Sequence, residues 1–190
     1  MRHTSLIICF LLLSFAVKAQ SSNEKLIQQF LKYNQLMIDK NFEEAVNYTM
    51  PEIFKIVTKE QLIQVLKQTM NPPELEFKMG LPSPSDFQQV QIIEGKKYVR
   101  FFNNSTIEMR LTDYKNTSPT SFAITKAAFE KQFGQGNVTY NESSGYFTIK
   151  SKKKVIGRSP ENSDDWKFAV IDTDNQKKIL SLFIPAEVLE

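Results

Sequence analysis

Histidine and cysteine, two residue types that many active sites use, are almost missing from this sequence. Its 190 residues include one histidine, His3, and one cysteine, Cys9. Imidazole and thiolate groups are the side chains most often used as bases and nucleophiles near neutral pH. Both residues lie within the first nine positions, so their availability depends on whether that segment stays in the protein.

The first nineteen residues have the pattern of a secretory signal peptide. Arg2 precedes an apolar run over 6–17 (LIICFLLLSFAV), and Val17-Lys18-Ala19 puts small residues at positions −3 and −1 of a cleavage site. Twelve helical residues extend about 18 Å, at roughly 1.5 Å each, which is short of the roughly 30 Å of bilayer hydrocarbon. We therefore expect cleavage after Ala19, no integral membrane segment in the mature protein, and a secreted or periplasmic location.

Cleavage would remove both His3 and Cys9. The remaining chain, 20–190, would then have no disulfide, no thiolate nucleophile, no imidazole base and no Cys/His metal site. Asp172-Thr173-Asp174-Asn175 resembles the start of a calcium loop, but Lys177 and Phe183 occupy the positions that need Gly and Glu. We expect a turn there, and neither a metal nor a cofactor anywhere in the protein.

The densest basic run is Lys150-Ser151-Lys152-Lys153-Lys154, with Arg158 nearby. In a strand, Lys150, Lys152 and Lys154 share one face. One interpretation is a patch that binds anions such as lipid headgroups or acidic polysaccharides; the other is a solvated outer face or a lysine-protected edge. Nucleic-acid sites depend on arginine forks and interleaved aromatics, so we expect no nucleic-acid partner. The mature chain has only three arginines, at positions 100, 110 and 158.

Two aromatic stripes form the second candidate site. Tyr98, Arg100 and Phe102 alternate with apolar or polar neighbours, and Trp166 and Phe168 repeat the pattern further along. Aromatic stripes at strand spacing usually belong to the core. The alternative is a pocket lined by Tyr98, Arg100, Trp166 and Phe168, with the guanidinium as a fixed charge for an apolar or carboxylate-bearing ligand.

Hydrophobic periodicity and capping residues predict helices first and strands later. We expect helices over 23–40 and 41–46, a third one led by Pro51, and another that a Thr58–Gln61 capping box starts. The second half predicts strands interrupted by one helix, and no linker divides the chain, so we predict a single α+β domain over 20–190. The expected strands are 75–79, 90–92, 98–102, 106–111, 146–156 and 165–171, with a break at 81–85 and the helix at 125–133.

Three segments resemble the nuclear transport factor 2-like (cystatin-like) superfamily, in particular its secreted bacterial members. Residues 33–42 (YNQLMIDKNF) resemble its first helix and the step into the second, and residues 48–53 (YTMPEI) its proline-led third helix. Residues 159–168 (SPENSDDWKF) resemble the hairpin before its penultimate strand. The resemblance implies N-terminal helices packed on a curved antiparallel sheet, cone-like. The helix expected at 125–133 departs from the minimal pattern of the superfamily and is an insert.

The same resemblance leaves the function open because the superfamily contains both enzymes and binding domains. Its enzymes use an Asp/His or an Asp/Tyr pair inside the cone. The mature chain has no histidine, and although Tyr98, Tyr33 and Asp39 are available for an Asp/Tyr pair, nothing in their spacing selects them. We assign no catalytic residue.

Three hypotheses follow from the sequence. The leading one is a secreted or periplasmic, non-enzymatic domain that binds a small hydrophobic ligand or a protein partner, with a homodimer through the open sheet face as one form. The second is an isomerase or dehydratase that uses Asp and Tyr for acid–base catalysis. The third is a structural envelope protein. An open cavity with an ionisable residue would favour the enzyme, and a plugged cone would favour binding.

The signal peptide leads to the first prediction. We expect the exported protein to begin at Gln20, because Ala19 completes the cleavage pattern. N-terminal sequencing and intact mass of protein recovered from its own host check this, and a mature chain that begins at Met1 would contradict it.

Overall fold

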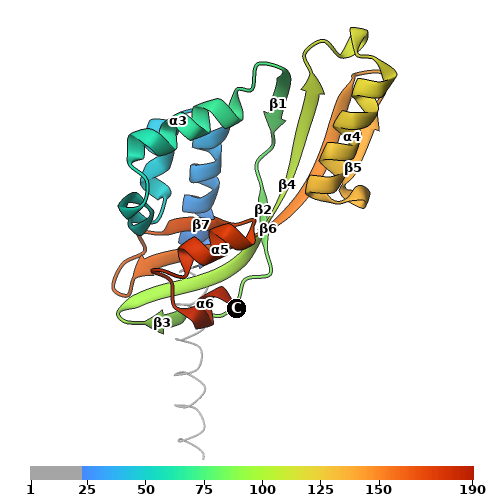
Figure 1. The fold of residues 1–190 in the computed structure, drawn as a ribbon. Helices are drawn as coiled ribbons and strands as arrows, with labels where there is room; N and C mark the ends of the chain where they lie inside the picture. The colour runs from blue at the N-terminus through green and yellow to red at the C-terminus, as the bar shows by residue number, and fades with distance from the viewer. Residues whose placement is uncertain (1–22) are drawn as a thin grey trace, which may run out of the picture.

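Two long antiparallel strands run through the whole molecule. The computed structural model describes residues 23–190, and within them seven strands form one antiparallel sheet. At its centre, β4 (Lys96–Leu111) pairs with β6 (Tyr146–Pro160), in a register that extends from Lys96 opposite Pro160 to Met109 opposite Phe147. Figure 1 shows the two strands crossing from the larger part of the molecule into the smaller one.

The shorter strands pair with the ends of this central pair. On the outer side of β4, β3 (Gln91–Ile93), β2 (Ser83–Ser85) and β1 (Leu75–Met79) follow one another along its length. On the outer side of β6, β7 (Lys167–Ile171) pairs with its C-terminal end and β5 (Val138–Asn141) with its N-terminal end. The sheet is therefore widest at its two ends.

N-terminal helices cover one face of the sheet in the larger lobe. Residues 23–38 are helical, and α2 (Phe42–Ala45), the short 3-10 helices η1 (Val46–Tyr48) and η2 (Pro51–Lys55), and α3 (Lys59–Met70) follow. As predicted, Asn41 caps α2, and Thr58 and Gln61 form a capping box at the start of α3. The element led by Pro51 is the 3-10 helix η2 and not an α-helix.

The core of the larger lobe lies on both faces of the sheet. On one face the helix at 23–38 packs against the strands through one buried cluster; its members are Leu26, Phe30, Val99, Phe101, Val155, Trp166 and Phe168. The opposite face is covered by α5 (Asp174–Leu180) and α6 (Ala186–Leu189). That second cluster consists of Met50, Tyr98, Ile156, Ala169, Leu180, Ile184, Val188 and Leu189.

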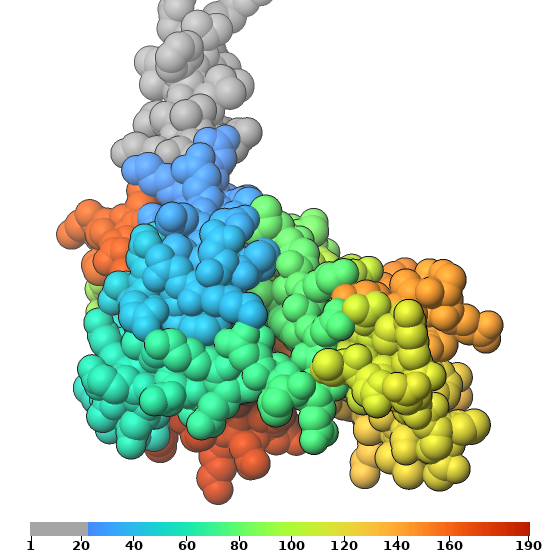
Figure 2. All heavy atoms as spheres, turned by 90° about the horizontal axis from the view of Figure 1, so that it is seen from above, coloured from blue at the N-terminus to red at the C-terminus, as the bar shows by residue number. Residues whose placement is uncertain are grey.

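The smaller lobe is the predicted helical insert. Its helix, α4 (Pro119–Phe133), packs on the far ends of β4 and β6 and on β5, through the buried residues Phe129, Val138, Phe147 and Ile149. The short helices η3 (Tyr114–Asn116) and η4 (Gln135–Asn137) flank it in sequence. Figure 2 shows this lobe, in yellow and orange, protruding beside the helical part of the molecule. The fold is thus α+β, with N-terminal helices on a curved antiparallel sheet and one helical insert.

Some boundaries differ from those predicted. Residues 98–102 and 106–111 belong to one strand, since the polar residues between them continue the ladder with β6. Residues 81–85 contain β2 where a break was expected, and Pro84 is tolerated because β2 is a short strand at the edge of the sheet. The prediction of a turn at 172–175 is wrong for its last two residues. They are the first residues of α5, which starts at Asp174 because Thr173 and Gln176 form a capping box.

No helix among residues 23–190 is long and apolar enough to cross a membrane. The predicted signal peptide lies outside the described residues.

Gly145 provides a test of the smaller lobe. Its φ of +74° is a conformation that L side chains rarely adopt, and a Cβ there would overlap the ring of Tyr114. We expect Gly145→Ala to lower the free energy of unfolding by about 1–3 kcal/mol, measured by urea denaturation. Gly136→Ala is the matched control, since nothing lies within 4 Å of its Cβ position. Equal stability of the two variants would contradict the described turn.

Candidate functional site

The four residues predicted to line a ligand pocket do not come together. Trp166 and Phe168 are buried against the helix at 23–38, whereas Tyr98 is buried on the opposite face beneath α5 and α6. Arg100 lies on the Tyr98 face, where its Nε donates a hydrogen bond to Oε1 of Gln88 at 2.7 Å. Because side chains alternate across a sheet that is covered on both faces, Tyr98 and Arg100 lie on the face opposite Trp166 and Phe168.

The candidates for an Asp/Tyr pair are also separated by their environments. Tyr33 packs against the rings of Phe30, Tyr48 and Phe168, and burial raises the pKa of its hydroxyl. Asp39 is exposed and accepts a hydrogen bond from Nε2 of Gln35 at 2.8 Å. One group is a core phenol and the other a surface carboxylate, so they do not form an acid–base pair.

A buried ion pair lies beside Tyr98 that the sequence did not indicate. Arg158 of β6 binds Glu52 of η2, and both side chains are largely buried at the edge of the cluster under α5 and α6. Burial is also the main reason why the pKa of Tyr98 is raised. The ion pair joins η2 to the sheet. It faces packed side chains, because the C-terminal helices cover this face with Leu180, Ile184 and Val188.

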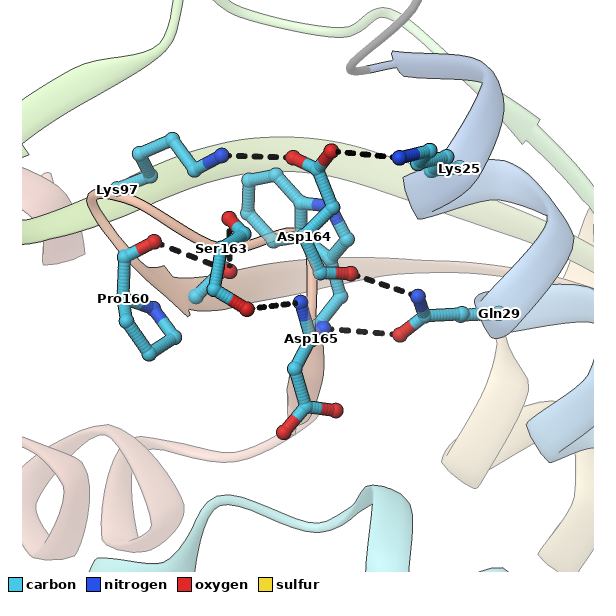
Figure 3. A network of polar contacts seen from close by, with 9 residues as sticks. Lys25, Gln29, Lys97, Pro160, Ser163, Asp164 and Asp165 are labelled. Atoms are coloured by element: carbon cyan, nitrogen blue, oxygen red, sulfur yellow. Dashed lines mark hydrogen bonds and ion pairs between the residues drawn. The ribbon is translucent and has the colours of Figure 1, made fainter.

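A second polar network fixes the hairpin before β7, as Figure 3 shows. The carboxylate of Asp164 binds Lys97 at 2.7 Å and Lys25 at 3.1 Å. The side chain of Gln29 donates to the backbone carbonyl of Asp164 at 2.7 Å and accepts from the backbone N–H of Trp166 at 2.8 Å. The network attaches the first helix to the hairpin and holds the Trp166 ring in the core, which is a structural role.

The hollow with the chemistry of a binding site lies at the waist between the lobes. It has a volume of about 570 Å³ and is formed by the middle of β4 and β6, the connection from β1 to β2, the C-terminal end of α4 and the end of β7. Ten of its fourteen lining residues carry a hydroxyl, amide or ammonium group. The residues are Gly80, Leu81, Ser83, Asn104, Ser105, Thr106, Gln132, Phe133, Asn137, Lys150, Ser151, Lys152, Lys153 and Asp172.

Lysines of the basic run border this waist hollow from both faces of β6, with Lys150 and Lys152 on one face and Lys153 on the other. Lys153 pairs with Asp172 across the ladder, and Lys152 pairs with Asp86 at 2.8 Å. The hydrogen bond from Lys152 is the main reason why the pKa of Asp86 is lowered. Among the described residues, no carboxylate pairs with Lys150. The lining thus has three ammonium groups and one carboxylate, and it attracts anions.

The sequence indicated half of this site. Lys150, Lys152 and Lys154 alternate along β6 as predicted for a strand, while Lys153 points to the other face. The neutral lining comes from Ser83, Thr106 and Asn137, whose proximity depends on how distant segments pair, and no local pattern predicts it. Among residues 23–190 no group of three or more His, Cys, Asp or Glu side chains has the arrangement of a metal site.

Comparison with known proteins gives no identification: no protein-family model matches this sequence, and no curated protein matches it significantly.

The network around Asp164 predicts a pH effect on stability. Its pKa is lowered mainly by the Lys97 hydrogen bond, so folding favours the ionised carboxylate. The stabilisation is therefore present above the ordinary carboxyl pKa, near 4, and is lost as the pH falls through the lowered value. We expect Asp164→Asn to cost roughly 1–3 kcal/mol at neutral pH and to flatten the loss of stability in acid.

Urea denaturation at several pH values measures this. Asp165→Asn is the control, because that exposed carboxylate pairs only with Lys167 at 2.7 Å among the described residues, and we expect it to cost less than about 1 kcal/mol. Parallel acid profiles for wild type and Asp164→Asn would contradict the assigned role.

Proposed function

We propose that this protein is a non-catalytic binding domain that works outside the cytoplasm and holds an anionic, hydroxyl-bearing ligand in the waist hollow. The observation that carries the proposal is the lining itself. Lys150, Lys152 and Lys153 provide positive charge, and Ser105 and Thr106, among others, provide neutral hydrogen-bonding groups. The predicted signal peptide supports the location, and the sequence resemblance to the nuclear transport factor 2-like superfamily, which contains binding domains, supports the role.

Binding is favoured over catalysis by what the hollow contains. Of the described residues that line it, the only carboxylate is Asp172, which is paired with Lys153. A general acid or base needs a perturbed group that reaches the substrate. Tyr33 and Tyr98, the tyrosines whose pKa values are raised, lie in the packed core instead.

A polar ligand is favoured over the small hydrophobic ligand expected from the sequence. The aromatic side chains that would have received an apolar molecule are core residues, and Trp166 is completely buried. On the face of Tyr98, the place of such a ligand is taken by Leu180, Ile184, Val188 and Leu189 of the protein itself. On this face the protein's own side chains thus occupy the space that an apolar ligand would need.

A monomer is favoured over a homodimer through the sheet face. The larger lobe has helices on both faces, and the smaller lobe is covered by α4 on one face. The opposite face of the smaller lobe carries charged side chains, among them Glu76, Lys78 and Arg110. Such a surface lacks the apolar centre of a stable homodimer.

The proposal predicts that lysines of the waist are needed to bind anions. We expect the wild-type protein to bind polygalacturonate, a polymer of uronic acid, at low ionic strength. The combined substitution Lys150→Gln, Lys152→Gln and Lys153→Gln should weaken binding about tenfold, since each exposed ion pair contributes about 0.2–1 kcal/mol. Isothermal titration calorimetry measures the affinity, and thermal unfolding verifies that the variant is folded.

The charge-matched control is Lys55→Gln, Lys59→Gln and Lys115→Gln, which removes three exposed lysines away from the waist. It should retain most of the affinity. Equal losses in both triple variants would show that binding follows net charge alone, and that result would contradict a site at the waist.

A further inference from the structure

We propose that the ligand is an extended acidic polysaccharide that contacts Lys150 and Lys152 where they border the waist hollow and continues along the same face of β6, over Phe102, toward α6. This inference rests on the proposed function, because it names the ligand class of the same site. To Lys150 and Lys152, which border the hollow, it adds Arg100, Phe102 and Lys154, and these five residues form a strip on one face of the sheet.

The first argument is the spacing of the positive charges. Lys150, Lys152 and Lys154 alternate along a regular strand, so their side chains leave the same face about every 6.6 Å. Opposite them on β4 lie Thr106, Asn104 and Phe102, in the same order. A compact anion can contact one or two of these ammonium groups. A linear polyanion can contact all three in succession. Lys154 lies outside the hollow, so only a ligand that extends beyond the hollow can contact it.

The second argument is the aromatic ring within this strip. Phe102 is partly exposed, and the ammonium group of Lys152 lies 4.4 Å from the centre of its ring. Arg100 lies two residues before Phe102 on β4 and on the same face. Its hydrogen bond to Gln88 fixes the guanidinium at the end of the strip that is farther from Lys150. An aromatic face next to cations suits a chain whose units each combine an apolar C–H face with a carboxylate, as uronic acid units do.

The third argument is that a ligand on the strip would replace only weak contacts within the protein. The Lys152–Asp86 pair is 53% and 57% exposed, and exposed pairs contribute little, so a ligand carboxylate can replace Asp86. The ammonium group of Lys154 contacts only the backbone carbonyl of Glu190, at 3.4 Å, among the described residues. Asn104 donates to Ser83 and Ser85, which holds its amide in place beside the strip.

A polysaccharide fits better than a nucleic acid. Arg100 is the one arginine on this strip. Arg110 and Arg158 lie outside it and are bound to Glu76 and Glu52. Channels for single-stranded nucleic acids stack successive bases on several aromatic rings, whereas Phe102 is the single aromatic residue between positions 150 and 154 of β6 and their partners.

The experiment is a length series of oligogalacturonates, from the disaccharide to the octasaccharide, titrated into the full mature protein. We expect the affinity to rise with length and to level off once the chain covers the strip. Lys154→Gln and Phe102→Ala should each weaken the octasaccharide about three- to fivefold and leave the disaccharide unchanged. Thermal unfolding verifies that both variants are folded.

A gain of affinity gives a second readout that misfolding cannot imitate. Asp86 has a φ of +53°, a conformation that asparagine tolerates, so Asp86→Asn should fold normally and free Lys152. We expect it to bind the octasaccharide about two- to threefold more tightly.

Four outcomes separate this inference from the proposed function. Length-dependent binding that Lys154→Gln weakens would support both. Binding that is lost in the triple lysine variant but is equal for disaccharide and octasaccharide would leave the proposed function standing and overturn the polysaccharide strip. Tighter binding of a single-stranded oligonucleotide of equal charge would also overturn it. Failure of every uronate to bind would overturn both proposals.

Discussion

The long ladder between β4 and β6 is the constraint on which the rest of the structure depends. Its register extends from Lys96 opposite Pro160 to Met109 opposite Phe147, and every other strand of the described sheet pairs with one of these two. In both lobes the helices therefore pack on the same pair of strands. Because the side chains alternate and the ladder has no break, the burial of each end fixes which residues face outward in the middle.

The two ends of the ladder are buried by different means. Helices from both ends of the sequence enclose the larger lobe, and one inserted helix covers the smaller lobe on one face. Between them, over residues 103–106 and 150–153, apolar side chains give way to Asn, Ser, Thr and Lys. The polar side chains of a stretch that neither core covers form hydrogen bonds with water, and they can form them equally well with a polar ligand.

The distribution of paired charges supports this division of roles. Asp164, Glu52 and Glu76 bind Lys97, Arg158 and Arg110 in partly buried networks that join secondary structure elements. The lysines at the waist are held by weaker, more exposed contacts. The residues that hold the fold together are thus different from those proposed to bind a ligand. Substitutions can therefore change ligand binding without changing the stability of the fold.

Local pattern in the sequence determined most of the helices and strands, the α+β class, the caps at Asn41 and Thr58, the inserted helix and the basic strand, because each of these depends on neighbours within a few residues. It also determined that, without the first nineteen residues, no histidine or cysteine is available. Only the tertiary structure decided that Tyr98 and Trp166 lie on opposite, covered faces, and that Ser83, Thr106 and Asn137 surround the lysines. The physical reason is that strand pairing and the placement of α5 and α6 are non-local: the same aromatic stripe serves as core or as pocket wall according to what packs over it.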